Sequence, residues 1–439
     1  MEFLFSGNNE LIDYYAQIAG ITNEGFSRIL KTDAHGQLRA SGTDIGNRNS
    51  FVTTFGQVVT SQKDTQISEQ FAYGLPGTGV LSGTTGTGEI ATEDSLLKIR
   101  NTGSGDGTAY VQSLQCVRYI PGSMAYLYFT VSGLPYGVDG ANAWCGLFDD
   151  EDGFAIGMQD GVPSLLRRRY NGIDADDYII SIDDFDDKLD GNGKSGYTIN
   201  WDKGQLFAIM FGYLGFAPIS FLVKKDDDEW VEFHKIRYPN SNIETHISFP
   251  YLPIRFEIDN TGAGVPISIH SGSVDAGIFN GGKTDSTFSY SSVGSARAAN
   301  VPITSTDALI IAIRGKEILG DRVNKISSLL DNVGISTEGS NRTVSFSVVK
   351  NPTVITDGTW TSISDNSPLE FSTNTVFNLN TGSGTGVQTV IFKEQVYRAT
   401  DLDNISVLLR RGETLVFRMR SGAPGGTISD YVFGFKDLF

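Results

Sequence analysis

The stretch GLFDDEDGFAIGMQDG, residues 146–161, carries the strongest fold signal in the sequence. Two apolar, strand-like runs, WCGLF and FAIGM, flank four consecutive acids and a glycine. Asp and Gly are residues that tight turns prefer, so the acids lie where the chain must reverse direction. The stretch therefore predicts a β-hairpin with an acidic turn.

A period of two residues, typical of β-strands, continues through most of the chain from about residue 51. In AYLYFTV, residues 125–131, the two faces carry Tyr126, Tyr128 and Thr130, and Leu127, Phe129 and Val131. Both faces are bulky, which predicts that both are covered. Further runs, such as 205–212 and 219–224, follow at roughly 8–12-residue intervals with turn signals between them. The pattern predicts an all-β protein built on an antiparallel jelly roll or β-sandwich.

The chain length predicts more than one domain, because 439 residues exceed what a single hydrophobic core usually organises. The 51 glycines fit many short strands joined by turns. Residues 286–305 are rich in Ser, Ala and Gly, which predicts an interdomain linker. We therefore expect a jelly-roll domain over 46–285 and a second, smaller β-sandwich over 306–439.

The N-terminal residues 1–45 differ from the rest of the chain. NNELIDYYAQIAG, residues 8–20, has apolar residues at helical spacing between a capping Asn and a terminal Gly, which predicts a short helix. The following KTDAHGQLRASGT predicts two strands around a turn. Because this segment is too small for a core of its own, we expect it to dock on another component as an anchor.

The charge and the cysteines limit the partners and the compartment. A net charge of -17 argues against nucleic acid, which requires clustered Lys and Arg. The basic cluster Arg167–Arg169 is expected to be a strand end balanced by the acids that follow.

Cys116 and Cys145 lie in apolar runs, which predicts two buried free thiols. No Sec-type signal is visible in MEFLFSGNNE. The sequence also contains no apolar run of about 18 residues, the length that would predict a membrane span. We therefore expect the protein to fold in the cytoplasm.

The acids Asp149, Asp150 and Asp152 raise the question of a metal site. A calcium loop needs oxygen ligands at alternating positions, then Gly, then a later bidentate Glu. Aligning Gly153 with that Gly places Phe148 where the first Asp should be. We therefore expect solvated turn residues and no cofactor, with a weak calcium site at these three acids as the alternative.

A second acidic tract, residues 174–190, has apolar residues threaded through it. It is typical of a strand with a solvated acidic edge, which also discourages aggregation between sheets. The acids of this tract could bind calcium, but their spacing matches no specific calcium-binding motif. The candidate ligand-binding residues of this region are Tyr170, Asp174 and Asp176.

Enzymatic chemistry is not expected. A jelly-roll glycosidase would need Glu, Asp and Glu at alternate positions of one strand, and the nearest match, Glu257-Ile258-Asp259, is followed two residues later by Thr261. The four histidines, His35, His234, His246 and His270, lack metal-ligand spacing. There is no nucleophile elbow, phosphate loop or dinucleotide fingerprint.

Several motifs occur together and in order across the chain. They are GNRNSF (46–51), QFAYG (70–74), RYIPG (118–122), GLFDDEDGFAIGMQDG (146–161), DKLDGNGKSGYTINWDKGQLFAIMFGYLGF (187–216), HKIRYPNSN (234–242), DNTG (259–262), VKNPTVITDGTWTSISDNSPLEFS (349–372) and LRRGETLVFRM (409–419). From about residue 45 to the end, this set resembles virion structural proteins of tailed bacteriophages. The resemblance implies an all-β particle component with a concanavalin-like jelly roll, and it carries over no catalytic residues.

We therefore expect a non-enzymatic structural protein of the virion, assembled in the host cytoplasm and anchored by its N-terminus. Its β-domains would project as a head decoration, fibre or tail appendage. The expected partners are capsid or tail proteins and further copies of the chain, a trimer being the first expectation for a fibre.

The alternative is a carbohydrate-binding adhesin, whose lectin-like jelly roll recognises host surface glycans through the loops near 146–161 or 170–190. Aromatic residues that could form a stacking platform are Tyr119, Tyr126, Tyr128, Tyr136, Trp144 and Trp201, although most are expected in the core.

Overall fold

The computed structural model describes two groups of residues and several strand backbones. The groups are 63–75, 79–102, 105–226, 229–260 and 262–279, and 291–293, 309–335, 345–378, 407–420 and 431–438; the backbones are 19–21, 27–29, 31–32, 38–39, 288–290, 294–295, 301–302, 308, 336–338, 343–344, 385–393, 396–398, 421 and 427–430. Within these residues the only helical element is a single 3-10 turn, η1 (Ile182–Asp184). No helix among them is long and apolar enough to cross a membrane.

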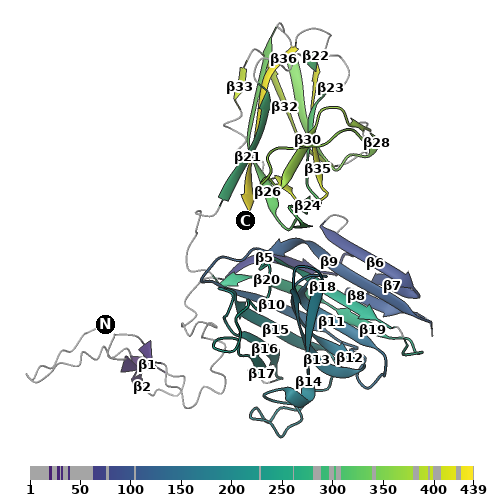
Figure 1. Ribbon diagram of the computed structural model, residues 1–439, viewed down its shortest axis with the longest axis vertical. Helices are drawn as coiled ribbons and strands as arrows, with labels where there is room; N and C mark the ends of the chain where they lie inside the picture. The colour runs from purple at the N-terminus through teal and green to yellow at the C-terminus, as the bar shows by residue number, and fades with distance from the viewer. Residues whose placement is uncertain are drawn as a thin grey trace, which may run out of the picture.

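Two antiparallel sheets form the first sandwich (Figure 1). The six-stranded sheet has the order β17 (Trp230–Ile236), β16 (Ile219–Lys224), β15 (Gln205–Gly212), β10 (Met124–Val131), β20 (Ser273–Phe279), β5 (Lys63–Gln70). The seven-stranded sheet has the order β14 (Ala175–Ser181), β13 (Val162–Tyr170), β12 (Gly153–Gln159), β11 (Asn142–Phe148), β18 (Leu252–Asp259), β9 (Gly107–Val117), β6 (Val80–Gly86). The all-β, antiparallel jelly-roll prediction is confirmed.

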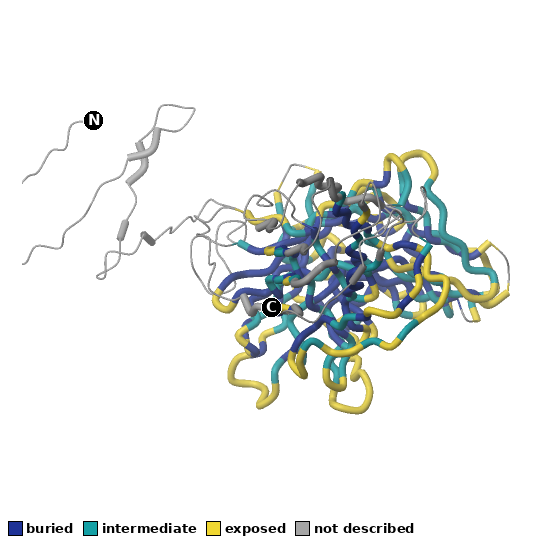
Figure 2. The backbone as a smooth tube through the Cα atoms, turned by 90° about the horizontal axis from the view of Figure 1, so that it is seen from above, coloured by how far each residue is buried: buried dark blue, intermediate teal, exposed yellow. Residues whose placement is uncertain are grey.

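The core of this sandwich lies between the two sheets. Leu127 and Phe129 of β10 share one buried cluster with Cys145 and Leu147 of β11, as the period of two requires. A three-stranded sheet, in the order β19 (Ser268–Ser271), β8 (Leu96–Asn101), β7 (Gly88–Glu93), adds Ile99 to the same cluster. Figure 2 shows this buried interior with exposed loops around it.

The second sandwich has its own core. One sheet has the order β21 (Phe288–Ser295), β36 (Thr427–Leu438), β26 (Ser327–Glu338), β33 (Val396–Arg398), with β22 (Val301–Pro302) and β34 (Val407–Leu409) at its sides. The other has the order β29 (Thr361–Ser362), β30 (Leu369–Ser372), β23 (Ala308–Gly315), β35 (Thr414–Ser421), β27 (Thr343–Lys350), β32 (Thr385–Lys393). Phe417 and Phe433 stack between the sheets with ring centroids 4.0 Å apart. The prediction of a second, smaller sandwich is confirmed.

The predicted linker, 286–305, needs a correction. Strand β21 pairs with β36 from Phe288 to Ser295, so these residues belong to the second sandwich. The pattern looked like a connector in part because a serine, Ser291, fills an inward position where an apolar residue is usual. Ser291 is buried and donates a 2.5 Å hydrogen bond to the carboxylate of Asp437 on β36.

The N-terminal predictions are tested only in part. The predicted helix at 8–20 lies outside the described residues except for Ala19 and Gly20, which belong to strand β1 (Ala19–Ile21), paired with β2 (Ser27–Ile29). The predicted pair of strands around the turn at 33–36 is confirmed by β3 (Lys31–Thr32) and β4 (Leu38–Arg39).

Candidate functional site

The acidic hairpin is formed by β11 and β12, as predicted. Asp149 organises the turn with its own side chain, because its Oδ1 accepts the backbone N–H groups of Glu151 at 2.9 Å and Asp152 at 3.0 Å. This local side-chain bond is the property that makes Asp a turn residue. The turn is therefore closed in part by a side chain of its own.

A lysine from the second sandwich contacts this turn. Lys325 lies just before β26, and its side chain is only 4% exposed. Its Nζ is 2.6 Å from Oδ2 of Asp149 and 3.5 Å from Oε2 of Glu151. Burial alone would lower the pKa of Lys325, but the two carboxylates raise it above its usual value. The buried ion pair joins the two sandwiches.

The other two acids of the hairpin are also paired. Asp150 is 84% exposed, and its Oδ1 lies 2.7 Å from Nη1 of Arg255 on β18. Asp152 is fully buried and accepts the backbone N–H and the hydroxyl of Ser248, each at 2.6 Å. The expectation of solvated acids is therefore wrong for Asp149 and Asp152. Their partners come from segments distant in sequence, which turn chemistry does not reveal.

Two arginines of the second sandwich extend the junction. Arg322 donates to the hydroxyl of Ser248 at 3.2 Å, and its guanidinium lies 5.2 Å from the ring centroid of Tyr170. Arg410 donates to Oε1 of Gln115 on β9 at 3.4 Å. Basic groups of one sandwich thus face acidic and amide groups of the other.

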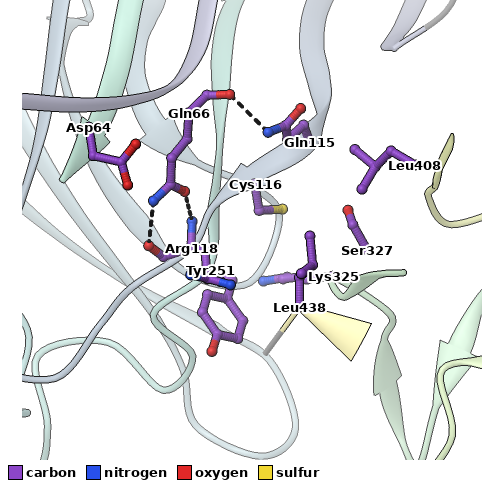
Figure 3. Close-up of a pocket in the computed structure, with 10 residues that line it drawn as sticks. All are labelled: Asp64, Gln66, Gln115, Cys116, Arg118, Tyr251, Lys325, Ser327, Leu408 and Leu438. Atoms are coloured by element: carbon purple, nitrogen blue, oxygen red, sulfur yellow. Dashed lines mark hydrogen bonds between the residues drawn. The ribbon is translucent and has the colours of Figure 1, made fainter. Parts of the chain in front are cut away.

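A cavity of about 180 Å³ opens beside Lys325 at this junction (Figure 3). Gln66 on β5 lines the cavity. Its side chain is held in place by the backbone of Arg118, because it accepts from the N–H of Arg118 at 2.6 Å and donates to the carbonyl oxygen of Arg118 at 3.1 Å.

Cys116 also lines the cavity, and burial raises the pKa of its thiol to about 12. A thiol protonated at neutral pH is a poor nucleophile. Cys116 and Cys145 are both free, but only Cys145 is fully buried, so the thiol prediction holds in part.

The face of the seven-stranded sheet that points away from the core is polar and aromatic. We name this set the charged face: Tyr110, Gln112, Trp144, Arg168, Arg255 and Glu257. Glycines make room for its rings, because a Cβ on Gly83 would lie 2.6 Å from the Tyr110 ring. A Cβ on Gly157 would lie 2.9 Å from the Trp144 ring.

The glutamate of the near-match to a glycosidase motif lies on the charged face. Oε2 of Glu257 is 2.7 Å from Nε of Arg255. Burial raises the pKa of Glu257, while Arg255 and Arg168 oppose that rise. The geometry describes a carboxylate held in an ion pair.

A groove of about 70 Å³ runs between the charged face and the second sandwich. It is lined by Leu81, Tyr110, Gln112, Asp149, Asp150, Glu151, Arg255, Val323 and Arg411. Guanidinium and amide donors, carboxylate acceptors and one half-buried phenol ring meet there. Such a set can form several hydrogen bonds to the hydroxyl groups of a ligand.

The residues predicted as ligand-binding do not converge on a pocket. Asp174 is exposed in the turn between β13 and β14, and Asp176 is exposed on β14, whereas Tyr170 at the end of β13 lies under Arg322 at the junction. The predicted balance of the basic cluster is confirmed for Arg168, which makes two hydrogen bonds to Asp177, at 2.7 and 2.8 Å, whereas Arg169 pairs with Glu244 instead.

The junction residues Lys325, Arg322 and Arg411 were missed by sequence reasoning. They lie in two short segments, DRVNK (321–325) and RRG (410–412), and no spacing rule connects either segment to residues 149–152.

The weak calcium alternative has little geometric support. Each of Asp149, Asp150 and Asp152 faces a cation or an N–H or O–H donor. Among the described residues, no group of three or more His, Cys, Asp or Glu side chains is placed to hold a metal ion.

We expect removal of divalent cations to leave the thermal midpoint of unfolding unchanged within about 1 °C. A calcium ion present at 100 times its Kd would add about 2.7 kcal/mol of stability, which shifts the midpoint by several degrees. Thermal scans in EDTA and in millimolar calcium distinguish the two cases. A large, EDTA-reversible stabilisation by calcium would restore the metal hypothesis.

No family model and no curated protein matches this sequence. Several solved structures are similar to this chain in fold, among them the following three. The cellulose induced protein Cip1 is 13% identical and covers 48% of this chain and 96% of its own, with a TM-score of 0.32. A legume lectin-like domain from Entamoeba histolytica is 13% identical over 45% of this chain and 89% of its own, with a TM-score of 0.29. A glycoside hydrolase family protein from Mycobacterium thermorestibile is 14% identical over 48% of this chain and 99% of its own, with a TM-score of 0.33. Similarity at this level carries no function over to this chain.

Proposed function

We propose that this protein is a non-enzymatic structural component of a tailed-bacteriophage particle that displays two β-sandwiches as one body. One observation supports this most. The acidic hairpin, the strongest candidate for chemistry in the sequence, is engaged in ion pairs and hydrogen bonds at the junction of the sandwiches.

A buried ion pair suits that role. Taking charges out of water offsets much of their attraction, so such pairs add little net stability compared with apolar contacts. They do fix relative orientation, because a misplaced partner leaves a buried charge unpaired. Two sandwiches held in one orientation can project from a particle as a decoration, fibre or tail appendage.

The remaining features of the proposal follow from the motifs that resemble virion proteins. Residues 1–45 anchor the chain to capsid or tail proteins, and further copies complete a homo-oligomer, with a trimer as the first expectation. The net charge of -17 keeps neighbouring copies soluble at high local concentration.

Deletion of residues 1–45 tests the anchoring. We expect the shortened chain to unfold cooperatively like the full chain but to be absent from purified particles, as measured by mass spectrometry and electron microscopy. Incorporation at the normal copy number would contradict the proposal, and so would absence of the full-length chain from particles.

A second candidate function, recognition of host surface glycans, is favoured by the groove beside the charged face. Gln112, Arg255 and Arg411 supply donors, Asp150 supplies an acceptor, and Tyr110 supplies a ring. Sugar ligands are held by such combinations of planar polar groups and aromatic rings.

For this candidate we expect the double variant Gln112→Ala, Arg411→Ala to weaken glycan binding at least tenfold, which equals about 1.4 kcal/mol. The two side chains line the groove, and neither belongs to the main core. The measurement is a glycan array followed by titration of the best ligand, with Lys188→Ala as a control because Lys188 pairs with Asp183 at an exposed site. If no glycan binds the full chain, with or without calcium, only the structural role stays.

A further inference from the structure

The buried amine of Lys325 lies very close to a carboxyl carbon. Its Nζ is 2.6 Å from Oδ2 of Asp149 and 3.5 Å from Oε2 of Glu151. Among the described residues, neither Nζ of Lys325 nor Oε2 of Glu151 has a hydrogen-bond partner at an acceptable angle, although both atoms are buried. Because Oδ2 is bonded to Cγ, a nitrogen 2.6 Å from Oδ2 lies within about 4 Å of Cγ. The amine is therefore within reach of the carbon that a nucleophile would attack.

The other oxygen of the Asp149 carboxyl group is held by the backbone. Oδ1 accepts the N–H groups of Glu151 at 2.9 Å and of Asp152 at 3.0 Å. Two donors at about 2.7–3.1 Å are the arrangement that stabilises the oxyanion of an acyl transfer. Oδ1 can therefore carry the developing charge, while Oδ2, on the side of the amine, can leave.

The surroundings of the pair hold it in place and limit its contact with water. The side chains of Lys325 and Asp149 are 4% and 11% exposed, and the Phe249 ring centroid lies 5.4 Å from Nζ. Groups fixed in this way react with effective concentrations of about 10⁵–10⁸ M. The cavity beside Lys325 has a volume of about 180 Å³ (Figure 3), so it can receive one released water, which occupies about 30 Å³.

We propose that Lys325 and Asp149 form an intramolecular isopeptide bond, with Glu151 as the proton relay. The ion pair described above is the reactant. Glu151 takes one proton from the ammonium and passes it to Oδ2, which leaves a neutral amine beside a neutral acid. Nζ then attacks Cγ, and the electron pair of the carbonyl bond moves onto Oδ1.

Collapse of this intermediate releases water. A second proton passes from Nζ through Glu151 to Oδ2, the bond between Cγ and Oδ2 breaks, and the carbonyl bond to Oδ1 forms again. One hydrogen stays on the amide nitrogen, and Glu151 returns to its starting state. An ammonium and a carboxylate thus become an amide and one water, without an oxidant or another reactant. The bond joins the acidic hairpin of the first sandwich covalently to the second sandwich.

Mass spectrometry of the denatured full chain tests the proposal. We expect a mass lower than that of the sequence by one water. Trypsin cannot cleave after an acylated Lys325, so digestion should yield a branched peptide that joins residues 119–167 to residues 323–342.

Three variants test the assigned roles. Lys325→Arg should show the full sequence mass, because a guanidinium stays protonated and is no nucleophile. Glu151→Gln keeps both reacting groups but should form the branched peptide at least tenfold more slowly after synthesis, since a positioned proton relay contributes about 10²–10⁴-fold. The matched control is Lys188→Arg at the exposed pair with Asp183, which should keep the loss of one water.

A wild-type chain with the full sequence mass would overturn the proposal, and this result does not depend on whether any variant folds. A loss of water located in a linear peptide would also overturn it, because a succinimide at an Asp-Gly sequence has the same mass. Equal rates of branched-peptide formation in the wild-type protein and Glu151→Gln would contradict the proton relay.

Discussion

Replacing Lys325 by alanine is expected to lower the free energy of unfolding by about 3–5 kcal/mol, the range seen when one partner of a buried ion pair is removed. The lysine is almost completely buried, and its loss leaves the carboxylates of Asp149 and Glu151 without their cation. The junction should weaken, so that the two sandwiches unfold in separate steps.

Calorimetry and urea titration measure both effects. Lys188→Ala is the matched control, because Lys188 contacts Asp183 at 3.1 Å with both side chains largely exposed, and such pairs contribute at most about 1 kcal/mol. A Lys325→Ala protein as stable as this control would show that the junction ion pair does not hold the sandwiches together.

His246 is expected to cause the second large effect, a loss of stability on mild acidification. It is fully buried, with Phe154 and Tyr213 each at 5.5 Å between ring centroids, and its Nε2 is 3.4 Å from the carbonyl of Gly212. Burial lowers its pKa from 6.5 to about 4, and the charge of Arg167 acts in the same direction.

Because the pKa is lower in the folded state, the unfolded state takes up a proton first as the pH falls. The stability from a neutral His246 is fully present above pH 6.5 and is lost progressively as the pH falls toward about 4. The lowering from 6.5 to about 4 corresponds to roughly 3 kcal/mol at full effect.

Urea titrations between pH 7 and 4 measure this loss. In His246→Gln the dependence across that window should be much flatter, whereas His270→Gln, at a partly exposed position, should retain most of it. Equal slopes for the wild-type protein and His246→Gln would contradict the assignment.

Local signals in the sequence were sufficient to predict much of the fold. The hairpin at 146–161 needed only the preference of Asp and Gly for turns, and it is present as β11 and β12. The strands at 205–212 and 219–224 have the predicted bounds, because their apolar runs are flanked by clear turns. Alternation in 125–131 correctly separated two covered faces, because Leu127 and Phe129 lie in one buried cluster and Tyr126 lies in another.

The candidate site could not be predicted in the same way. Asp149 and Lys325 belong to different sandwiches and are brought together only by the tertiary structure, and nothing in either segment identifies the other. Strand β21 escaped prediction because Ser291 satisfies an inward position by hydrogen bonding to Asp437. In both cases polar pairing over long sequence distances replaced the apolar periodicity on which sequence reasoning depends.

The most direct test of the claim that the acidic hairpin joins the sandwiches is a double-mutant cycle between Lys325 and Asp149, measured as free energies of unfolding. Residues in one ion-pair network show interaction energies of about 0.5–3 kcal/mol, whereas independent sites add within about 0.5 kcal/mol. We predict that Lys325→Ala and Asp149→Ala couple by about 2 kcal/mol or more. Additivity of the two single losses would contradict the claim.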